Sequence, residues 1–149
     1  MPEVEGVFKE LKMCGFKTAL ISSSIPKIAL EKLAERLEAD FISGLEAGLS
    51  EGKLSGEIWG DVIEPEGKAI ALRKILNDGE SSFHYCIGVA DDRNNIPLFQ
   101  LCSLKIGYNP DFLLSRKSDY IVKGELSKII PIIKGEHVES RGRIFSQSN

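Results

Sequence analysis

Short apolar runs alternate with amphipathic segments along almost the whole chain, and this alternation restricts the fold more than any other feature. Four apolar runs predict buried strands, at residues 18–21, 85–90, 104–107 and 120–122. Apolar residues at helical spacing predict helices between them, at 3–14, 25–37, 67–76, 96–101 and 126–133. Strands that alternate with helices favour an α/β fold with a mainly parallel sheet and helices on both faces.

One segment departs from this alternation. In residues 41–61, glycine recurs at every fourth position, and Ser50-Glu51-Gly52-Lys53 has the composition of a turn. Alternating polar and apolar residues flank that turn, so a β-hairpin is expected here. The 149 residues favour a single domain. We expect its core to occupy 1–135, and the polar stretch 136–149 to be a loose tail.

Charge, apolar runs and cysteine content argue against a nucleic-acid partner and a membrane partner, and indicate the cellular setting. The net charge of -3 argues against nucleic-acid binding through bulk electrostatics. No apolar run approaches the ~18–20 residues of a membrane span, so no membrane partner is expected. The first residues lack the basic and apolar regions of a signal peptide. Cys14, Cys86 and Cys102 form no C-x-x-C pair, and the last two are expected to be buried thiols. A cytoplasmic setting fits this pattern.

Polar clusters follow two of the predicted strands, where ligands of parallel sheets bind. Ser22-Ser23-Ser24 would present hydroxyls and amides to a phosphate, or would cap the next helix. Asp91 would bind Mg²⁺ with help from Asn94 or Asn95, or would belong to an ordinary capped turn. Lys68 opens a helix and would neutralise a phosphate, or would be a surface lysine. Each cluster alone leaves both interpretations open.

The order of these features is more specific than any one of them. A serine after one strand, a lysine opening a later helix and an acidic turn after another strand resemble the haloacid dehalogenase (HAD) superfamily of phosphatases. Within that superfamily the chain is similar to the phosphoserine phosphatases over about residues 3–134. The similar segments are Phe8–Lys12 with Gly15–Ser22, Gly52–Gly56, Glu66–Ala69 and Val89–Leu98.

The resemblance implies a Rossmann-like three-layer core with a β-hairpin flap, and Mg²⁺-dependent hydrolysis of a phosphomonoester through an aspartyl-phosphate. The substrate implied is a small phosphorylated metabolite, with phosphoserine as the reference. Lys68 would hold the phosphoryl group and steady the nucleophile, and Asp91 would bind Mg²⁺. The implied phosphate-binding set is Ser22, Ser23, Lys68 and Asn94.

The sequence departs from the family at the step that needs a nucleophile. The family's first motif, D-x-D-x-[TV], supplies the nucleophilic aspartate and the general acid on the central strand, and no D-x-D occurs in these 149 residues. Asn95 stands where the fourth motif has an aspartate, Asp92 where it has glycine, and Ser23-Ser24 where Gly-Gly is usual. We therefore expect Mg²⁺ binding that is weak or absent.

The same departures predict that the chain alone is an inactive phosphatase core. It would be the larger part of a split enzyme, a non-catalytic phosphate-binding or regulatory partner, or a truncated gene fragment. Without the central strand of the family's sheet, the strands ending at Ser22 and Ala90 would each lack a neighbour. They would pair directly, exchange strands in a homo-oligomer, or accept a strand from a complementing chain.

Overall fold

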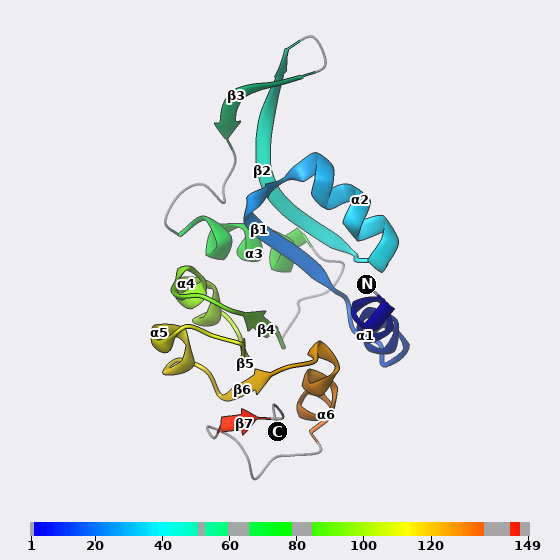
Figure 1. The fold of residues 1–149 in the computed structure, drawn as a ribbon, viewed down its shortest axis with the longest axis vertical. Helices are drawn as coiled ribbons and strands as arrows, with labels where there is room; N and C mark the ends of the chain where they lie inside the picture. Colours follow the sequence, from blue (N-terminus) through cyan, green and yellow to red (C-terminus); the bar gives the residue numbers. More distant parts are fainter. Residues whose placement is uncertain (1, 51–52, 60–65, 79–84, 136–143, 147–149) are drawn as a thin grey trace. The chain divides into compact units, whose positions relative to one another are not determined.

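The computed structural model describes residues 2–50, 53–59, 66–78, 85–135 and 144–146. The chain divides into two compact units. One unit spans residues 8–82, and the other combines residues 1–7 with 83–149. Helix α1 (Pro2–Met13) contributes to both. The elements of the two units are drawn in Figure 1.

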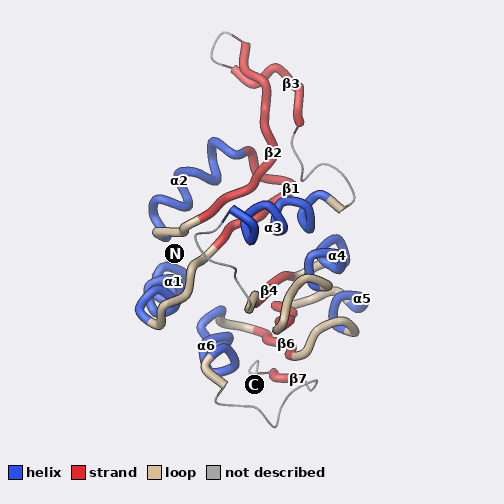
Figure 2. The backbone as a smooth tube through the Cα atoms, turned by 180° about the vertical axis from the view of Figure 1, so that it is seen from behind, coloured by secondary structure: helices blue, strands red, loops and turns tan. Residues whose placement is uncertain are grey.

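The unit of residues 8–82 is built on a three-stranded sheet with the order β1-β2-β3. β1 and β2 are parallel, whereas β2 and β3 form the predicted antiparallel hairpin, whose turn residues 51–52 lie outside the described part of the chain. Helices α2 and α3 both contact β1 and β2 (Figure 2). The bounds are β1 (Ala19–Pro26), α2 (Lys27–Leu37), β2 (Phe41–Ser50), β3 (Lys53–Trp59) and α3 (Gly67–Asp78).

Helix α2 shows how the sequence produces this packing. Its buried residues Leu30, Ala34 and Leu37 recur at helical spacing and therefore share one face. The helix ends at Glu38, which adopts a left-handed conformation with φ 54°. In that conformation the Glu38 amide donates to the carbonyl groups of the last helical turn. β2 comes from the segment that the sequence predicted as a hairpin, and it also pairs in parallel with β1 across α2.

The second unit contains a four-stranded parallel sheet with the order β4-β5-β6-β7. Its core lies on this sheet and on the short helices that follow the strands, where Phe99, Ile106, Leu114 and Val122 are almost fully buried. The bounds are β4 (Ile87–Ala90), α4 (Ile96–Phe99), β5 (Leu104–Tyr108), α5 (Phe112–Ser115), β6 (Tyr120–Lys123), η3 (Leu126–Lys128), α6 (Ile129–Ile133) and β7 (Ile144–Ser146).

The mixed α/β class and mainly parallel pairing are confirmed, but several details differ. Residues 144–146, within the stretch predicted as a loose tail, form β7 beside β6; the remainder of that stretch lies outside the described residues. The four-residue helix α5 was not predicted. Pro131 lies inside α6, and the preceding turn is the 3-10 helix η3.

The two strands that the sequence analysis expects to lack a neighbour, those ending near Ser22 and Ala90, are β1 and β4. β1 is the first strand of one sheet and β4 the first strand of the other. Each of these two strands has one hydrogen-bonded neighbour in its sheet, β2 for β1 and β5 for β4. No helix in the described ranges is long and apolar enough to cross a membrane.

Adjacent leucines on α5 provide a matched test of the core of the second unit. Leu114 has no exposed surface, whereas Leu113 is 43% exposed. We expect Leu114→Ala to lower the free energy of unfolding by about 3–5 kcal/mol, because it leaves a cavity. Leu113→Ala removes the same atoms from a partly exposed position and should cost about 1 kcal/mol or less. Urea denaturation measures both, and equal losses would contradict the placement of Leu114 in the core.

Candidate functional site

The predicted serine cluster forms a bulge in β1. The parallel pairing of β1 with β2 is regular as far as Ile21, which lies opposite Ser43, and it resumes where Pro26 lies opposite Leu45. Residues 22–25 therefore stand opposite Gly44 alone. A bulge turns the backbone and side chains of its residues out of the ladder. The three serines are thus displayed at the carboxyl end of the regular part of a parallel strand.

The hydroxyl of Ser22 closes this bulge. Its Oγ accepts the backbone amides of Ser24, at 3.2 Å, and Ile25, at 3.1 Å, and it lies 3.4 Å from the hydroxyl oxygen of Ser24. A hydroxyl carries one donor as well as its acceptor sites, so Ser22 still has a proton to donate to Ser24 or to a ligand. Ser23 and Ser24 are exposed.

The serines do not cap the following helix. Pro26 occupies the position before the first residue of α2, and no side chain caps that helix. The helix accordingly begins at Lys27, two residues later than the apolar pattern predicts. Of the two interpretations of Ser22-Ser23-Ser24, helix capping is therefore excluded. Ser22 satisfies the amides of its own bulge instead.

Gly44 makes room for the bulge. A Cβ atom at this position would lie 2.9 Å from the carbonyl oxygen of Ile25 and 3.2 Å from both Lys27 Cα and Leu30 Cδ2. Two of these three atoms belong to the backbone and cannot move without shifting the bulge or the start of α2. A glycine inside a strand commonly marks such a close approach of another backbone.

Lys68 lies in the first turn of α3 and is partly exposed. The amino-terminal end of a helix carries partial positive charge, and its first amides lack helical partners. A lysine there adds positive charge, which favours an anion at this end of α3. Because α3 contacts β1, one unit holds Lys68 together with Ser22 and Ser23.

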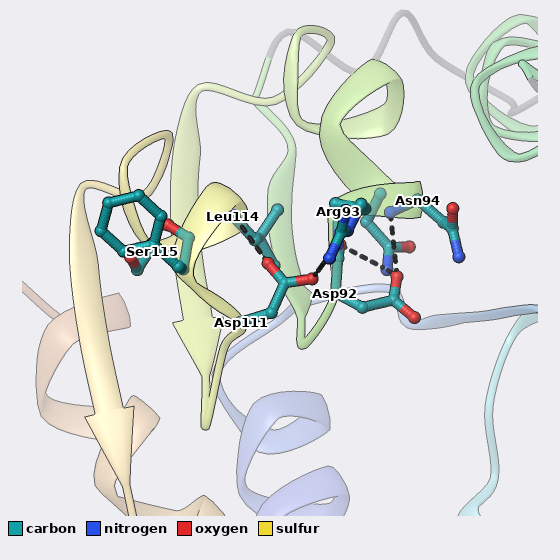
Figure 3. Close-up of polar contacts among 8 residues, drawn as sticks. Asp92, Arg93, Asn94, Asp111, Leu114 and Ser115 are labelled. Atoms are coloured by element: carbon teal, nitrogen blue, oxygen red, sulfur yellow. Dashed lines mark hydrogen bonds and ion pairs between the residues drawn. The ribbon is translucent and has the colours of Figure 1, made fainter.

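The acidic turn lies in the other unit, directly after β4. Asp91 is exposed, and its carbonyl oxygen accepts the amide of Asp111 at 2.9 Å. Asp92 caps the 3-10 helix η2 (Arg93–Asn95), where its Oδ1 accepts the amide of Asn94 at 3.0 Å. Asn94 is exposed, and its side chain points away from Asp111 in Figure 3.

Two departures from the family pattern contact each other in this turn. The Asn95 side chain is buried, and its Nδ2 donates to Asp92 Oδ1 at 3.0 Å and to the Asp92 carbonyl at 3.3 Å. An aspartate at position 95 would place a second carboxylate against that of Asp92. Like charges at this separation repel, so the amide at position 95 suits an aspartate at position 92.

Asp111, which sequence reasoning did not identify, fixes the position of this turn. Its Oδ2 accepts the Arg93 amide at 2.8 Å, and its Oδ1 accepts the Leu114 amide at 2.8 Å (Figure 3). The Arg93 Nε lies 3.6 Å from the same Oδ2. The Leu114 amide, and then the amide and charge of Arg93, hold the pKa of Asp111 below its usual value. The signal in the sequence was Asn109-Pro110-Asp111, a turn that precedes a helix.

The structure therefore separates the predicted site residues into two sets. Ser22, Ser23 and Lys68 belong to one unit, and Asp91 and Asn94 to the other. Across the described ranges, no group of three or more histidine, cysteine, aspartate or glutamate side chains is placed to hold a metal ion. In the described part of the chain, Asp91 offers one exposed carboxylate, and one oxygen of the Asp92 carboxylate, Oδ1, is engaged within its turn.

The curated proteins that this chain is similar to include several phosphoserine phosphatases. No protein-family profile matches the chain. A phosphoserine phosphatase of Methanocaldococcus jannaschii is 30% identical over 131 residues, which are 87% of this chain and 62% of that protein. A phosphoserine phosphatase of Mycobacterium tuberculosis is 28% identical over 119 residues, which are 80% of this chain and 29% of the relative.

Solved structures agree in fold. The phospho-aspartyl intermediate analogue of a phosphoserine phosphatase matches with a TM-score of 0.79 and 29% identity over 86% of this chain and 61% of that one. A probable phosphoserine phosphatase from Vibrio cholerae matches with a TM-score of 0.80 at 23% identity, covering 93% of this chain and 43% of that one. The chain thus spans less than two thirds of the relatives that it matches.

The pH dependence of stability tests the role of Asp111. A carboxyl whose pKa is lowered on folding stabilises the protein above its unfolded pKa, ~3.9, and this contribution disappears as the pH falls through the lower folded value. We expect Asp111→Asn to unfold at a lower temperature than the parent at pH 6, with the difference narrowing below about pH 4. Thermal unfolding monitored by circular dichroism from pH 7 to pH 3 measures this difference.

The control is Glu31→Gln, which changes an exposed carboxyl on α2. Its unfolding temperature should follow that of the parent across the whole range. A difference between Asp111→Asn and the parent that stays constant with pH would show that the carboxylate charge is not what holds the turn.

Proposed function

We propose that this chain, which is similar to phosphoserine phosphatases of the HAD superfamily, is the phosphoryl-binding core of a Mg²⁺-dependent phosphomonoester hydrolase. The observation that carries the proposal is the Ser22 bulge with α3 against the same strand. Hydroxyls, backbone amides and a lysine in one unit are the donors that a phosphoryl group requires.

Each residue of the proposed site has a distinct part. Ser22 and Ser23 would donate to phosphoryl oxygens at the end of β1, and Lys68 would neutralise their charge from the start of α3. Asn94 would add an amide donor after β4. Support for these roles comes from the exposure of Ser23 and Asn94, and from the bonds that fix the backbone around Ser22 and Asn94. A small phosphorylated metabolite of the phosphoserine type is the substrate class proposed.

The 149 residues alone are proposed to bind phosphate without hydrolysing its esters. Covalent phosphoryl transfer in this family requires an aspartate nucleophile, and the sequence contains no D-x-D. Bound Mg²⁺ would offset negative charge on the phosphoryl oxygens, with Asp91 as one ligand. Because Asn95 replaces an aspartate of the family's fourth motif, and Asp92 Oδ1 already accepts groups of Asn94 and Asn95, metal binding by this chain should be weak.

A non-catalytic role is the second candidate function. The bond between Asp92 and Asn95 favours it, because it uses one oxygen of the second carboxylate of the turn to hold the turn itself. In this role the chain would bind phosphate or a phosphorylated metabolite as a regulatory partner. The binding residues would be the same in both candidate functions. The hydrolase core would receive its nucleophile from another chain, whereas the regulatory partner would not.

Phosphate binding is tested by removing one positive charge. We expect isothermal titration calorimetry to detect binding of inorganic phosphate or phosphoserine, and Lys68→Ala to weaken it about tenfold, which is the usual value of one charge-assisted hydrogen bond. Lys74→Ala removes the same charge from a later turn of α3 and should change the affinity less than about twofold. No binding at millimolar ligand would contradict the proposal.

The same samples test whether the chain is inactive alone. With Mg²⁺ and p-nitrophenyl phosphate or phosphoserine, no release of phosphate above the uncatalysed rate is expected. Mg²⁺-dependent hydrolysis that disappears in Asp91→Ala would overturn the proposed lack of activity. It would leave the assignment of the phosphate-binding residues intact.

A partner chain is proposed to complete the sheet edges. β1 and β4 each begin a sheet, and an edge strand presents unpaired amides and carbonyls that recruit another strand. A second copy of the chain, or a complementing chain that carries the aspartates, would occupy these edges. We expect light scattering to give a mass above 16.4 kDa for the purified protein or for its mixture with the complementing chain. A monomer under both conditions would contradict this proposal.

A further inference from the structure

Two thiols lie side by side at the start of the second sheet, apart from the residues assigned to phosphate. The Sγ atoms of Cys86, just before β4, and Cys102, just before β5, are 3.8 Å apart. Cys86 is partly exposed, whereas Cys102 is 6% exposed. The third cysteine, Cys14, is exposed and belongs to the other unit. The sequence suggested two buried thiols with no functional spacing, and the structure brings them together.

The backbone pairing of β4 with β5 keeps these two cysteines close, with Cys86 one position out of register with Cys102. The carbonyl oxygen of Cys86 accepts the amide of Ser103 at 2.7 Å and that of Leu104 at 3.3 Å. The parallel ladder of β4 and β5 begins at the next residue, where Ile87 lies opposite Leu104. Sheet pairing therefore keeps the two cysteine backbones adjacent, and their approach does not depend on a flexible connection.

Gly88 provides the space that the Cys102 thiol occupies. A Cβ at position 88 would lie 2.7 Å from Cys102 Sγ and 3.2 Å from the ring of Phe99. Cys102 Sγ also lies 3.4 Å from the Leu98 carbonyl oxygen. The thiol of Cys102 therefore packs between α4 and the backbone of β4, in the space left because Gly88 has no side chain.

The two sulfurs differ in acidity, as an attacking thiol and a resolving thiol should. The hydrogen bond from Cys102 lowers the pKa of Cys86 to about 7, against an opposing effect of burial. The same hydrogen bond, together with burial, raises the pKa of Cys102 well above its usual value. A large fraction of Cys86 is therefore thiolate at neutral pH, and the thiolate is the reactive form.

We propose that Cys86 and Cys102 form a reversible disulfide when the protein meets a hydroperoxide. The Cys86 thiolate attacks one peroxide oxygen, the O–O bond breaks, and sulfenic acid and hydroxide or alkoxide form. That base removes the Cys102 proton. The Cys102 thiolate then attacks the Cys86 sulfur, the S–S bond forms and hydroxide leaves. The two sulfurs lose two electrons in total, and the peroxide gains them.

The geometry allows this step with a small movement. The 3.8 Å separation must shorten to the ~2.05 Å of a disulfide, and side-chain rotation can supply most of the change. The bond would close a loop from residue 86 to residue 102, which contains Asp91–Asn95 and α4. A crosslink of this length constrains the unfolded chain and should raise the unfolding temperature by roughly 5–10 °C.

The experiment uses a Cys14→Ser background, which leaves the pair as the only cysteines. After treatment with hydrogen peroxide, we expect the intact mass to fall by about 2 Da and peptide mapping to find residues 86 and 102 linked. Dithiothreitol should restore both the mass and the original unfolding temperature. Addition of oxygen to Cys86 while Cys102 remains a free thiol would overturn the proposal, as would complete resistance of both thiols to peroxide.

Two further measurements keep the proposal testable without depending on one variant. In Cys14→Ser with Cys102→Ala, dimedone should trap Cys86 as sulfenic acid, because the resolving thiol is gone. In the unmutated pair, the rate of alkylation of Cys86 by iodoacetamide should rise with a midpoint near pH 7. A midpoint at the ordinary thiol value of ~8.5 would contradict the activating role of Cys102.

Discussion

The second unit depends on one carboxylate, that of Asp111, which accepts amides from two segments distant in sequence. Its two oxygens bind the amides of Arg93 and Leu114, and its own amide donates to the carbonyl of Asp91. These three bonds tie the turn after β4 to the start of α5. The residues that follow a parallel strand have left the sheet, so their backbone amides need other hydrogen-bond partners. Here side-chain oxygens provide them. Ser22 does the same after the regular part of β1.

This manner of satisfying the backbone also determines which groups are left for a ligand. Asp92 Oδ1 is committed to its own turn through Asn94 and Asn95, so one of the two oxygens of the carboxylate beside Asp91 already has partners. Ser22 is committed as an acceptor but keeps a donor proton. Donors are therefore easier to find in this chain than anionic metal ligands, and this balance suits an anion better than a cation.

Sequence reasoning predicts well where a feature is local. The β1–α2–β2 order, the hairpin of β2 and β3, and the position of Lys68 in the first turn of α3 all follow from patterns of ten or so residues. It fails where partners are distant. Asp111 lies 18 residues from Arg93, so no local pattern reveals that contact. β7 has three residues and exists through its pairing with β6. The two-unit division likewise follows from contacts between segments, which spacing along the chain does not encode.

The bulge opposite Gly44 has an evolutionary consequence. Pairing is restored where Pro26 lies opposite Leu45. The four residues of the bulge therefore do not set the register of the strand before them, and they do not set which face of the following helix is apolar. Residues can be exchanged, added or removed there without moving an apolar side chain of α2 to the wrong face. Mutation can therefore change the chemistry presented at residues 22–25 while the hydrophobic pattern that folds the unit stays fixed.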